Sequence, residues 1–261
     1  MMNYTRIIAL LLMVATVSTT NANAGKSPNI MLILVDDMGY SDLGCYGGEI
    51  KTPHIDSLAT NGLRYSQFYN SARCVPTRAA ILSGYYAQQI NRDSVSDIKR
   101  TKDGNRPAWA PLLPKYIKRA GYRSYHSGKW HIDGKPMGSG FDRSLYIDSN
   151  NFFNPEKLFK DDKPHPPGEG FYATTAVADH TIEVLKEHQT KHADKPFFSF
   201  VAFTAPHFPL HALPEDIARV GDRYTVGWDV IRNQRWERLQ NMGLIRGTLS
   251  EVEYDQGPPF D

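Results

Sequence analysis

The sequence has little cysteine, little net charge and few long apolar runs. Its formal net charge is only +2 at neutral pH, so the composition gives no support for a nucleic-acid partner. Beyond the N-terminal segment, no apolar run reaches the roughly 20 residues of a membrane-spanning helix, which excludes a membrane span in the mature chain. No internal repeat is present. What remains is a chain of 261 residues, 41% of them hydrophobic, which is enough to bury a sizeable core in a soluble globular protein.

The first 24 residues have the pattern of a secretory signal peptide. Arg6 supplies the basic start, residues 7–17 form an apolar stretch, and Ala22-Asn23-Ala24 matches a cleavage site that would leave Gly25 as the new N-terminus. The apolar stretch is short for a membrane anchor, and no cysteine stands at the cleavage point to carry a lipid. We therefore expect residues 1–24 to be removed and the mature protein to be periplasmic or extracellular.

The only two cysteines are Cys45 and Cys74. In an oxidising compartment an isolated pair favours a disulfide. Cys74, however, opens a C-x-P-x-R pattern with Pro76 and Arg78. Pro76 suits the first turn of a helix, which would place Cys74 at a helix N-terminus, where backbone donors and the helix dipole favour negative charge. Arg78 follows one turn later and can reach the same place. Both a disulfide and an anion site are therefore open.

Short apolar runs alternate with segments of helical periodicity. The runs at 29–35 and 197–203 indicate strands buried on both faces, and residues 122–126 indicate a further strand. Helices are predicted at 52–62, from Cys74 onward, at 112–121, at 173–192 and at 227–241. Residues 63–69 are expected to be a strand or an extended segment, and the Gly- and Pro-rich stretch 137–170 is expected to be surface loops. This alternation favours an α/β fold with a mostly parallel sheet flanked by helices.

Amphipathic spacing also indicates which helical residues face the core. Ile55, Leu58 and Ala59 form the apolar face expected for the helix at 52–62. For the helix at 173–192, the supporting residues are Ala176, Ala178, Ile182 and Leu185.

Polar residues follow the predicted strands, where ligands of open α/β sheets bind. Asp36 and Asp37 come directly after the first strand. Adjacent carboxylates repel each other unless a cation neutralises them, and oxygen ligands suit Ca²⁺ or Mg²⁺, although a solvated turn explains the same pair. Lys129 and His131 would share one side of an extended segment, and His207 follows the last apolar run. Each of these motifs alone also fits an ordinary surface loop.

Together, in their order and spacing, these residues resemble the formylglycine-dependent sulfatases, which have an alkaline phosphatase-like fold. The resemblance covers nearly all of residues 28–243. Besides the C-x-P-x-R signature, it rests on Asp36-Asp37-Met38-Gly39, Thr52-Pro53-His54-Ile55-Asp56, Gly128-Lys129-Trp130-His131, Ala205-Pro206-His207 and Gly227-Trp228-Asp229. It implies that residues 25–261 are the N-terminal part of a sulfatase catalytic domain.

The resemblance implies a mechanism for sulfate monoesters, either aryl sulfates or sulfated glycans. A formylglycine-generating or sulfatase-maturating enzyme would convert Cys74 to formylglycine. One hydroxyl of the hydrated aldehyde would attack sulfur and expel the alcohol, and the second would release sulfate. Asp36, Asp37 and the modified Cys74 would hold Ca²⁺, or Mg²⁺ in its place, to polarise a sulfate oxygen.

The other roles implied by the resemblance fall to cations and proton donors around a tetrahedral anion. Arg78 would stabilise the hydrate's oxyanion, Lys129 would bridge sulfate and leaving group, His131 would assist the hydrate's collapse, and His207 would bind sulfate or protonate the leaving oxygen. His54, Arg143 and His211 are further residues expected to touch the leaving group.

One family feature has no counterpart in this sequence. The resemblance implies a further Asp-Asn pair in the metal site and a later Lys or Arg, yet the sequence has no Asp-Asn pair, and Asp148-Ser149-Asn150 does not match one. We therefore expect a sulfatase domain with an incomplete C-terminal half. Two alternatives follow: an inactive remnant that binds an anion or calcium, and a related phosphatase or phosphonate ester hydrolase. A Cys45–Cys74 disulfide would exclude the enzymatic readings.

Overall fold

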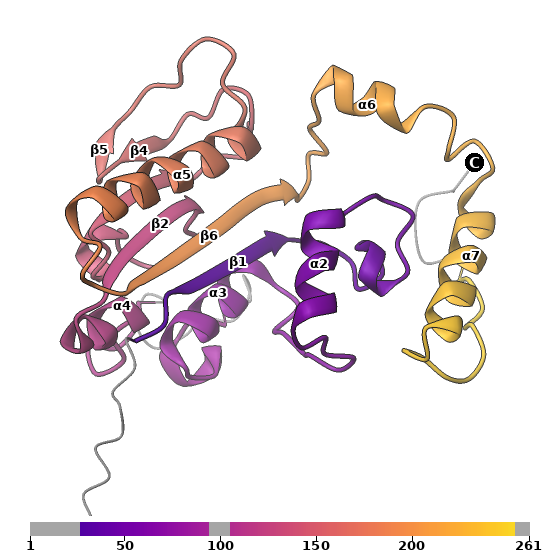
Figure 1. The fold of residues 1–261 in the computed structure, drawn as a ribbon, viewed down its shortest axis with the longest axis horizontal. Coiled ribbons are helices and arrows are strands. Elements are labelled where there is room, and N and C mark those ends of the chain that lie inside the picture. Colours follow the sequence, from indigo (N-terminus) through magenta and orange to yellow (C-terminus); the bar gives the residue numbers. More distant parts are fainter. Residues whose placement is uncertain (1–26, 94–104, 254–261) are drawn as a thin grey trace, which may run out of the picture.

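The computed structural model describes residues 27–93 and 105–253, so the predicted signal peptide lies outside the described residues. A six-stranded sheet of order β1-β6-β2-β3-β4-β5 forms the centre of the fold (Figure 1). The first four strands in that order are parallel, and the last two are antiparallel. The strands are β1 (Ile30–Asp36), β2 (Arg123–Lys129), β3 (Arg143–Ile147), β4 (Leu158–Lys160), β5 (Lys163–Pro164) and β6 (Phe197–Pro206).

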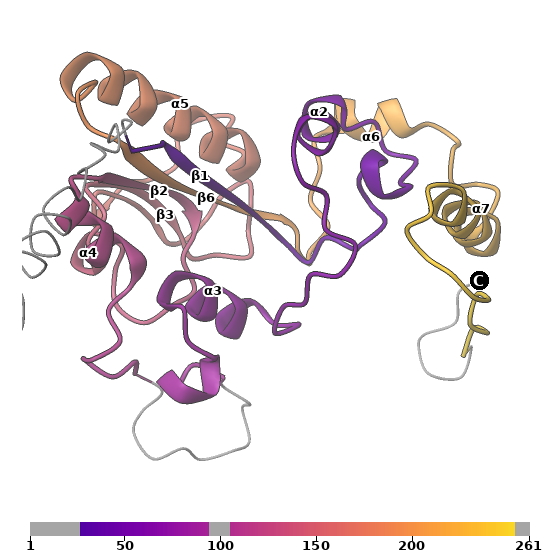
Figure 2. The same cartoon turned by 60° about the horizontal axis from the view of Figure 1, so that its bottom comes forward.

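Helices cover both faces of the sheet and extend beyond its carboxyl edge. α5 lies on one face and α3 and α4 on the other, while α2, α6 and α7 lie past the carboxyl ends of β1 and β6 (Figure 2). The α-helices are α2 (Pro53–Asn61), α3 (Cys74–Ser83), α4 (Leu113–Ile117), α5 (Ala173–Lys191), α6 (Pro214–Val220) and α7 (Trp228–Asn241). The 3₁₀ turns are η1 (Gly44–Tyr46), η2 (Ala87–Ile90), η3 (Lys118–Ala120) and η4 (Met137–Ser139).

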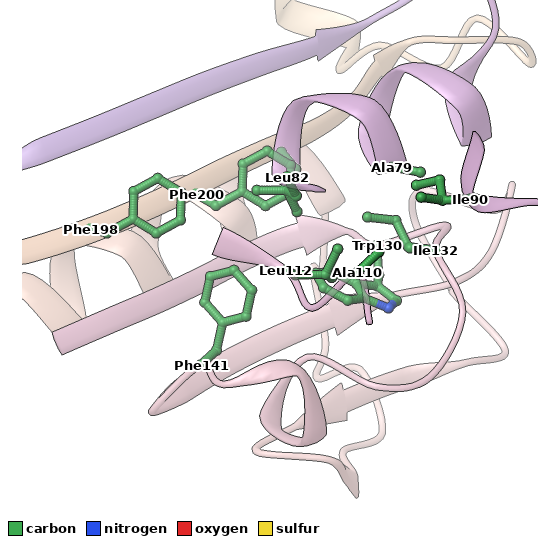
Figure 3. Close-up of a cluster of buried hydrophobic side chains, with 11 residues drawn as sticks. Ala79, Leu82, Ile90, Ala110, Leu112, Trp130, Ile132, Phe141, Phe198 and Phe200 are labelled. Atoms are coloured by element: carbon green, nitrogen blue, oxygen red, sulfur yellow. The ribbon is translucent and has the colours of Figure 1, made fainter. Parts of the chain in front are cut away.

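The core on the α3 side of the sheet is aromatic. Phe198 and Phe200 of β6 gather there with Leu82, Trp130 and Phe141 (Figure 3). All five are almost fully buried, and each such side chain contributes roughly 1.5–3 kcal/mol through removal of apolar surface from water. This packing fixes α3 against the sheet and therefore fixes Cys74 at the start of that helix.

The core on the α5 side contains polar side chains, and two pairs of them join β2 to α5. The Tyr125 hydroxyl and Nδ1 of His188 are 2.8 Å apart, and the Ser127 hydroxyl and Nδ1 of His180 are also 2.8 Å apart. These bonds join alternate residues of β2 to α5, because alternate strand residues point to the same face. Burial lowers the pKa of His180 to about 4, so this histidine is neutral near pH 7.

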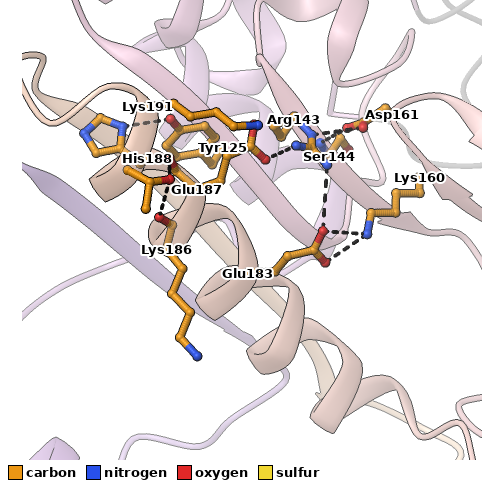
Figure 4. Close-up of polar contacts among 11 residues, drawn as sticks. Tyr125, Arg143, Ser144, Lys160, Asp161, Glu183, Lys186, Glu187, His188 and Lys191 are labelled. Carbon is orange, nitrogen blue, oxygen red and sulfur yellow. Dashed lines mark hydrogen bonds and ion pairs between the residues drawn. The ribbon is translucent and has the colours of Figure 1, made fainter.

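Ion pairs at the amino end of β3 also join α5 to the sheet. Arg143 bonds to Asp161 at 3.0 Å and to Glu187 of α5, while Lys160 bonds to Glu183 at 2.8 Å (Figure 4). Since parallel strands share one carboxyl edge, the amino end of β3 lies at the edge opposite the predicted site.

The predicted strand at 29–35 is confirmed as β1, but the expectation that both of its faces are buried is wrong. Within the described residues β1 pairs with β6 alone. Leu32 and Leu34 pack against the aromatic core, whereas Met31 and Ile33 remain 46% and 45% exposed. Met31 and Ile33 remain exposed because α5 packs on β6, β2 and β3 and does not cover the same face of β1.

Three further expectations differ from the structure. Residues 137–170 contain β3, β4 and β5 rather than loops alone. Pairing with β2 stabilises β3, a short strand that the surrounding Gly- and Asp-rich sequence does not predict. No strand forms at 63–69. α6 was not predicted.

The predicted helix at 173–192 is confirmed as α5, and its buried face is partly polar. α5 buries Val177, His180, Thr181 and Val184, while Ile182 is 50% exposed. The polar histidine and threonine face the sheet because β2 offers them partners, and no apolar pattern encodes that. α2 has no buried residue at all. None of the helices within the described ranges is long and apolar enough to cross a membrane.

Candidate active site

A small polar cavity of about 220 Å³ opens at the carboxyl end of β1. Its wall includes Asp36, Asp37, Cys74 and Arg78. These residues come from two elements far apart in the sequence, the end of β1 and the first turns of α3. The cavity therefore assembles four of the sequence-predicted residues at the edge where open α/β sheets bind ligands.

α3 begins at Cys74, as predicted. Arg73 precedes it in extended conformation, with φ −146° and ψ 149°, and no side chain caps the helix start. Pro76 lies in the first turn, where its missing N–H costs nothing, and Gly84 ends the helix in the left-handed region with φ 75°. The unbonded backbone N–H groups of this first turn and the helix dipole favour an anionic group beside Cys74.

Both cysteines are free thiols in the structure. Cys74 is partly buried at its helix start, whereas Cys45 lies in η1, where its N–H donates to Asp56 at 2.7 Å. Burial and the neighbouring Asp56 carboxylate raise the pKa of the Cys45 thiol. The disulfide alternative therefore has no support in this fold.

Arg78 is 1% exposed and connects three strand ends. Its Nη2 lies 3.0 Å from Oδ1 of Asp36, and its Nη1 donates to the carbonyl of Lys129 at 3.0 Å. Nη2 also approaches the carbonyl of Phe203 at 3.5 Å. A buried guanidinium needs such partners, so α3 and the ends of β1, β2 and β6 are held in one arrangement.

Asp36 lies between two cations. Besides Arg78, it accepts a 2.5 Å hydrogen bond from Nζ of Lys129, and only 4% of the residue is exposed. Burial alone would raise the pKa of Asp36, but the hydrogen bond from Lys129 and the charges of Arg78 and Lys129 outweigh it and hold the pKa below its usual value. Asp36 is therefore ionised at neutral pH.

Asp37 points elsewhere. Its φ of 64° lies in the left-handed region, which aspartate tolerates better than most residues, and its side chain is 58% exposed. Oδ2 of Asp37 lies 3.7 Å from Nε2 of His207. The turn at Asp37 thus separates the two adjacent carboxylates, so that one is buried among cations and the other faces a histidine.

His131 is the least constrained of the predicted residues. Trp130 and Ile132 on either side are buried, while His131 is exposed with φ 50° and makes no hydrogen bond within the described part of the chain. Partial desolvation, followed by the charges of Lys129 and Arg78, lowers the pKa of His131.

The residues expected around the leaving group do not gather at the cavity. Arg143 lies at the opposite edge of the sheet in the α5 ion pairs. His211 packs against Phe152 and Phe153, and His54 is exposed on α2.

The cavity wall also includes residues that sequence reasoning missed, namely Asn70, Arg73 and Thr77. Arg73 and Thr77 flank Cys74 within its motif, so their places at the helix start were a usable signal. Asn70 stands in an irregular segment with no pattern.

The described residues supply only part of a calcium site. No group of three or more His, Cys, Asp and Glu residues in the described ranges is arranged to hold a metal ion. Asp36 and Asp37 are donors of the right chemistry, but Ca²⁺ takes about six to eight oxygen ligands, and both oxygens of Asp36 already accept bonds from Arg78 and Lys129. These residues have the right chemistry for calcium, but they supply too few oxygen ligands to complete its coordination.

Comparison with known proteins places these observations in a family. The sulfatase family model matches residues 28–253. An uncharacterized sulfatase of Schizosaccharomyces pombe is 31% identical over 252 residues, covering 84% of this chain and 45% of the relative. The arylsulfatase of Klebsiella aerogenes is 30% identical over 256 residues, covering 88% of this chain and 54% of the relative. The chain thus spans about half the length of the curated relatives it matches.

Solved structures show the same likeness. The crystal structure of Ps i-CgsB matches with a TM-score of 0.67 and 27% identity, covering 84% of this chain and 56% of that one. A structure solved in complex with its substrate D-glucosamine-2-N,6-O-disulfate matches with a TM-score of 0.61 and 28% identity, covering 76% of this chain and 38% of that one.

Proposed function

We propose, since the chain belongs to the sulfatase family of sulfuric ester hydrolases, that the protein hydrolyses sulfate monoesters at the cavity beside Cys74. The observation that carries the proposal is the meeting of Cys74, Asp36, Asp37 and Arg78 in one small cavity at the carboxyl edge of the sheet. An attacking group, a cation-binding pair of carboxylates and a guanidinium are the parts that sulfuryl transfer requires.

Cys74 is the residue we assign as the precursor of the attacking group. Conversion to formylglycine by a maturation enzyme supplies, once the aldehyde is hydrated, one hydroxyl to attack sulfur and another to release sulfate. The free thiol and the uncapped start of α3 support this assignment, because the helix start favours the oxyanion form of such a hydroxyl.

Charge balance supports a divalent cation in the working site. Asp36 and Asp37 offset Arg78 and Lys129, so these four side chains together carry no net charge at neutral pH and attract a sulfate ester weakly. Ca²⁺ held by Asp36, Asp37 and further ligands, with Mg²⁺ as the other hard cation of suitable chemistry, would polarise a sulfate oxygen. With Asp36 turned to the cation, Arg78 and Lys129 become available to the substrate.

The remaining side chains are assigned to proton acceptance, proton donation and contact with the sulfate. His131 has a lowered pKa and is neutral near pH 7, so it can accept a proton from a hydroxyl on residue 74. His207, 3.7 Å from Asp37, lies at the end of β6, and we assign it to proton donation toward the leaving oxygen. Lys129 contacts the sulfate or its bridging oxygen.

A second candidate function is binding of an anion or calcium without turnover. It is favoured by one observation, the direct engagement of both Asp36 oxygens by Arg78 and Lys129, which competes with metal binding.

Mass spectrometry and a sulfate-release assay test the proposal together. The chain is coexpressed with a formylglycine-generating enzyme, and the Cys74 peptide is examined for oxidation of its CH2–SH group to an aldehyde, which replaces sulfur by oxygen and removes two hydrogens. We expect conversion, followed by calcium-dependent release of sulfate from 4-nitrophenyl sulfate. Cys74→Ser is the matched control, because serine lacks the second hydroxyl and should stop after one turnover.

Each other outcome has a definite meaning. Full conversion without sulfate release at any calcium concentration favours the non-catalytic candidate. Faster cleavage of 4-nitrophenyl phosphate than of the sulfate would identify a phosphatase, and an unconverted Cys74 in otherwise mature protein would rule out this mechanism.

A further inference from the structure

Two cations of the candidate active site are already bound by a carboxylate of the chain itself. Oδ1 of Asp36 lies 3.0 Å from Nη2 of Arg78, and Oδ2 of Asp36 accepts a 2.5 Å hydrogen bond from Nζ of Lys129. One carboxylate therefore binds a guanidinium and an ammonium at once. The oxygens of a sulfate would make the same kinds of charged hydrogen bond, so Asp36 stands where an anionic ligand would bind.

The exposure of these side chains leaves little of either cation for another anion. Arg78 is 1% exposed, and the side chain of Lys129 is 13% exposed. Asp36 lines the cavity beside Cys74 together with Arg78, although it is itself only 4% exposed. An anion that enters this cavity can therefore contact both cations fully only if the carboxylate of Asp36 moves away from them.

The end of β1 has an irregularity that allows such a movement. Pairing between β1 and β6 is regular up to Leu34, which stands opposite Ala202. Asp36 then stands opposite Pro206, so that two steps along β1 correspond to four steps along β6. Irregularities of this kind re-aim side chains beside active sites, and proline has no N–H to donate to the ladder. The regular ladder thus ends before Asp36.

Electrostatics identifies a divalent cation as the group that can draw Asp36 away. At the same distance it attracts a carboxylate twice as strongly as an ammonium does, and carboxylate oxygens are the ligands that Ca²⁺ prefers. Asp37, the next residue, offers a second carboxylate that is 58% exposed. Asp36 therefore has two competing sets of partners, the two side-chain cations and a metal ion.

We propose that Asp36 is an internal competitor of the sulfate ester. Its carboxylate blocks Arg78 and Lys129 until calcium draws it away, so that calcium and the sulfate group bind cooperatively. Because coupling between two ligands is reciprocal, each raises the affinity for the other by the same factor. The inference rests on the proposed function for its anion, and it adds that the protein binds a sulfate group weakly without calcium, whatever the rate of hydrolysis.

Calorimetry with inorganic sulfate and calcium chloride tests the inference on the purified wild-type protein. Sulfate should bind roughly tenfold or more tightly in saturating calcium than in the presence of a chelator. Calcium should bind more tightly by the same factor in saturating sulfate. The pairing of calcium with sulfate in buffer alone is measured separately and subtracted.

Asp36→Asn is the decisive variant, because it removes the competing charge. In the presence of a chelator it should bind sulfate about tenfold or more tightly than the wild type, and calcium should no longer raise that affinity. Asp37→Asn is the matched control, since it removes the same charge from the adjacent residue and leaves Arg78 and Lys129 paired with Asp36. It should change sulfate affinity in the presence of a chelator by less than about threefold.

Three results would overturn the inference: equal sulfate affinity with and without calcium, no sulfate binding under either condition, or wild-type sulfate affinity in folded Asp36→Asn. The wild-type comparison needs no variant, so it remains decisive if Asp36→Asn does not fold. Neither measurement needs formylglycine or turnover. Coupling without sulfate release in the assay would count against the proposed function alone, whereas sulfate release without coupling would count against this inference alone.

Discussion

β6 and β1 are neighbouring parallel strands of similar apolar character, and their burial is very different. Phe198, Phe200 and Ala202 of β6 are at most 1% exposed, whereas Ile30, Met31 and Ile33 of β1 are 39% to 46% exposed. β6 has a strand on each side and α5 above it, while β1 has β6 alone in the described residues. An apolar run therefore specifies a strand, whereas the adjacent strands and the covering helix determine how much of its surface is buried.

The open surface continues from β1 beyond the carboxyl edge. Leu58 of α2 is 64% exposed, and Phe68 and Tyr69 in the segment after it are 74% and 86% exposed. Two candidate catalytic residues lie at the ends of these strands: Asp36 is the last residue of the exposed strand β1, and His207 follows the buried strand β6.

The largest expected effect is on stability and compares a substitution in β6 with one in β1. Phe200→Ala should lower the free energy of unfolding by about 3–5 kcal/mol, because it leaves a cavity in a fully packed core. Ile33→Ala, the matched change on β1, should cost less than about 1 kcal/mol. Urea unfolding followed by circular dichroism measures both, and equal costs would show that β1 is covered in solution.

The next effect separates the two carboxylates at the end of β1. Asp36→Asn should cost about 3 kcal/mol, because it leaves the buried Arg78 without its anion. Asp37→Asn should change stability by no more than about 0.5 kcal/mol, since its side chain is exposed. Both values come from urea unfolding at pH 7 without added calcium. A larger loss for Asp37→Asn would contradict the pairing described here.

Acid should destabilise the covered half through its buried histidines. Burial lowers the pKa of His126 to about 3 and that of His180 to about 4, so below pH 6.5 the unfolded chain binds protons that the folded chain does not. Stability is therefore full above pH 6.5 and falls with pH by about 1.4 kcal/mol per unit for each histidine until its folded pKa is reached. Unfolding measured from pH 7 to 4.5 should show this slope. His180→Gln should make it shallower, and an unchanged slope would mean that His180 is not buried as a neutral group.

The smallest effect concerns the attachment of α7. A hydrogen bond from Arg235 lowers the pKa of Glu49 to about 2, against partial desolvation that would raise it. The stabilisation is present above the unfolded pKa of 4.5 and is lost as the pH falls toward 2. Glu49→Gln should therefore cost about 1–2 kcal/mol at pH 7 and nothing near pH 2, as measured by hydrogen exchange in α7. Asp216→Asn, in an exposed i,i+3 pair with Arg219, is the control, and a matching loss there would refute a specific role for Glu49.

Local signals predicted the elements that carry the candidate site. Pro76 and Gly84 define α3, and the apolar runs before Asp36 and His207 define β1 and β6. The parallel arrangement then brings their ends together. By contrast, β3 is a five-residue strand whose signal is too short to stand out, and the polar face of α5 depends on partners in β2.

The candidate site shows the same division. Its residues were found from motifs and strand ends, but the motifs assign Asp36 to a metal, whereas the fold pairs it with Arg78 and Lys129. The cavity lined by Ile231, Trp236 and Leu239 of α7 was not predicted, because the rest of its wall comes from several loops that have no common pattern. The conversion of Cys74 and the calcium site stay predictions for the experiments above.

The sequence by itself determined where β1, β6 and α3 form, where those two strands end, and which reactive side chains stand at those ends, because these features depend on residues close together in the chain. Tertiary structure alone decided that β1 is an open edge within the described residues, that Asp36 is held by two cations while Asp37 turns toward His207, and that a mostly apolar cavity forms along α7. Burial and ion pairing depend on groups from distant parts of the chain, so only the packed fold brings them within a few ångströms of one another.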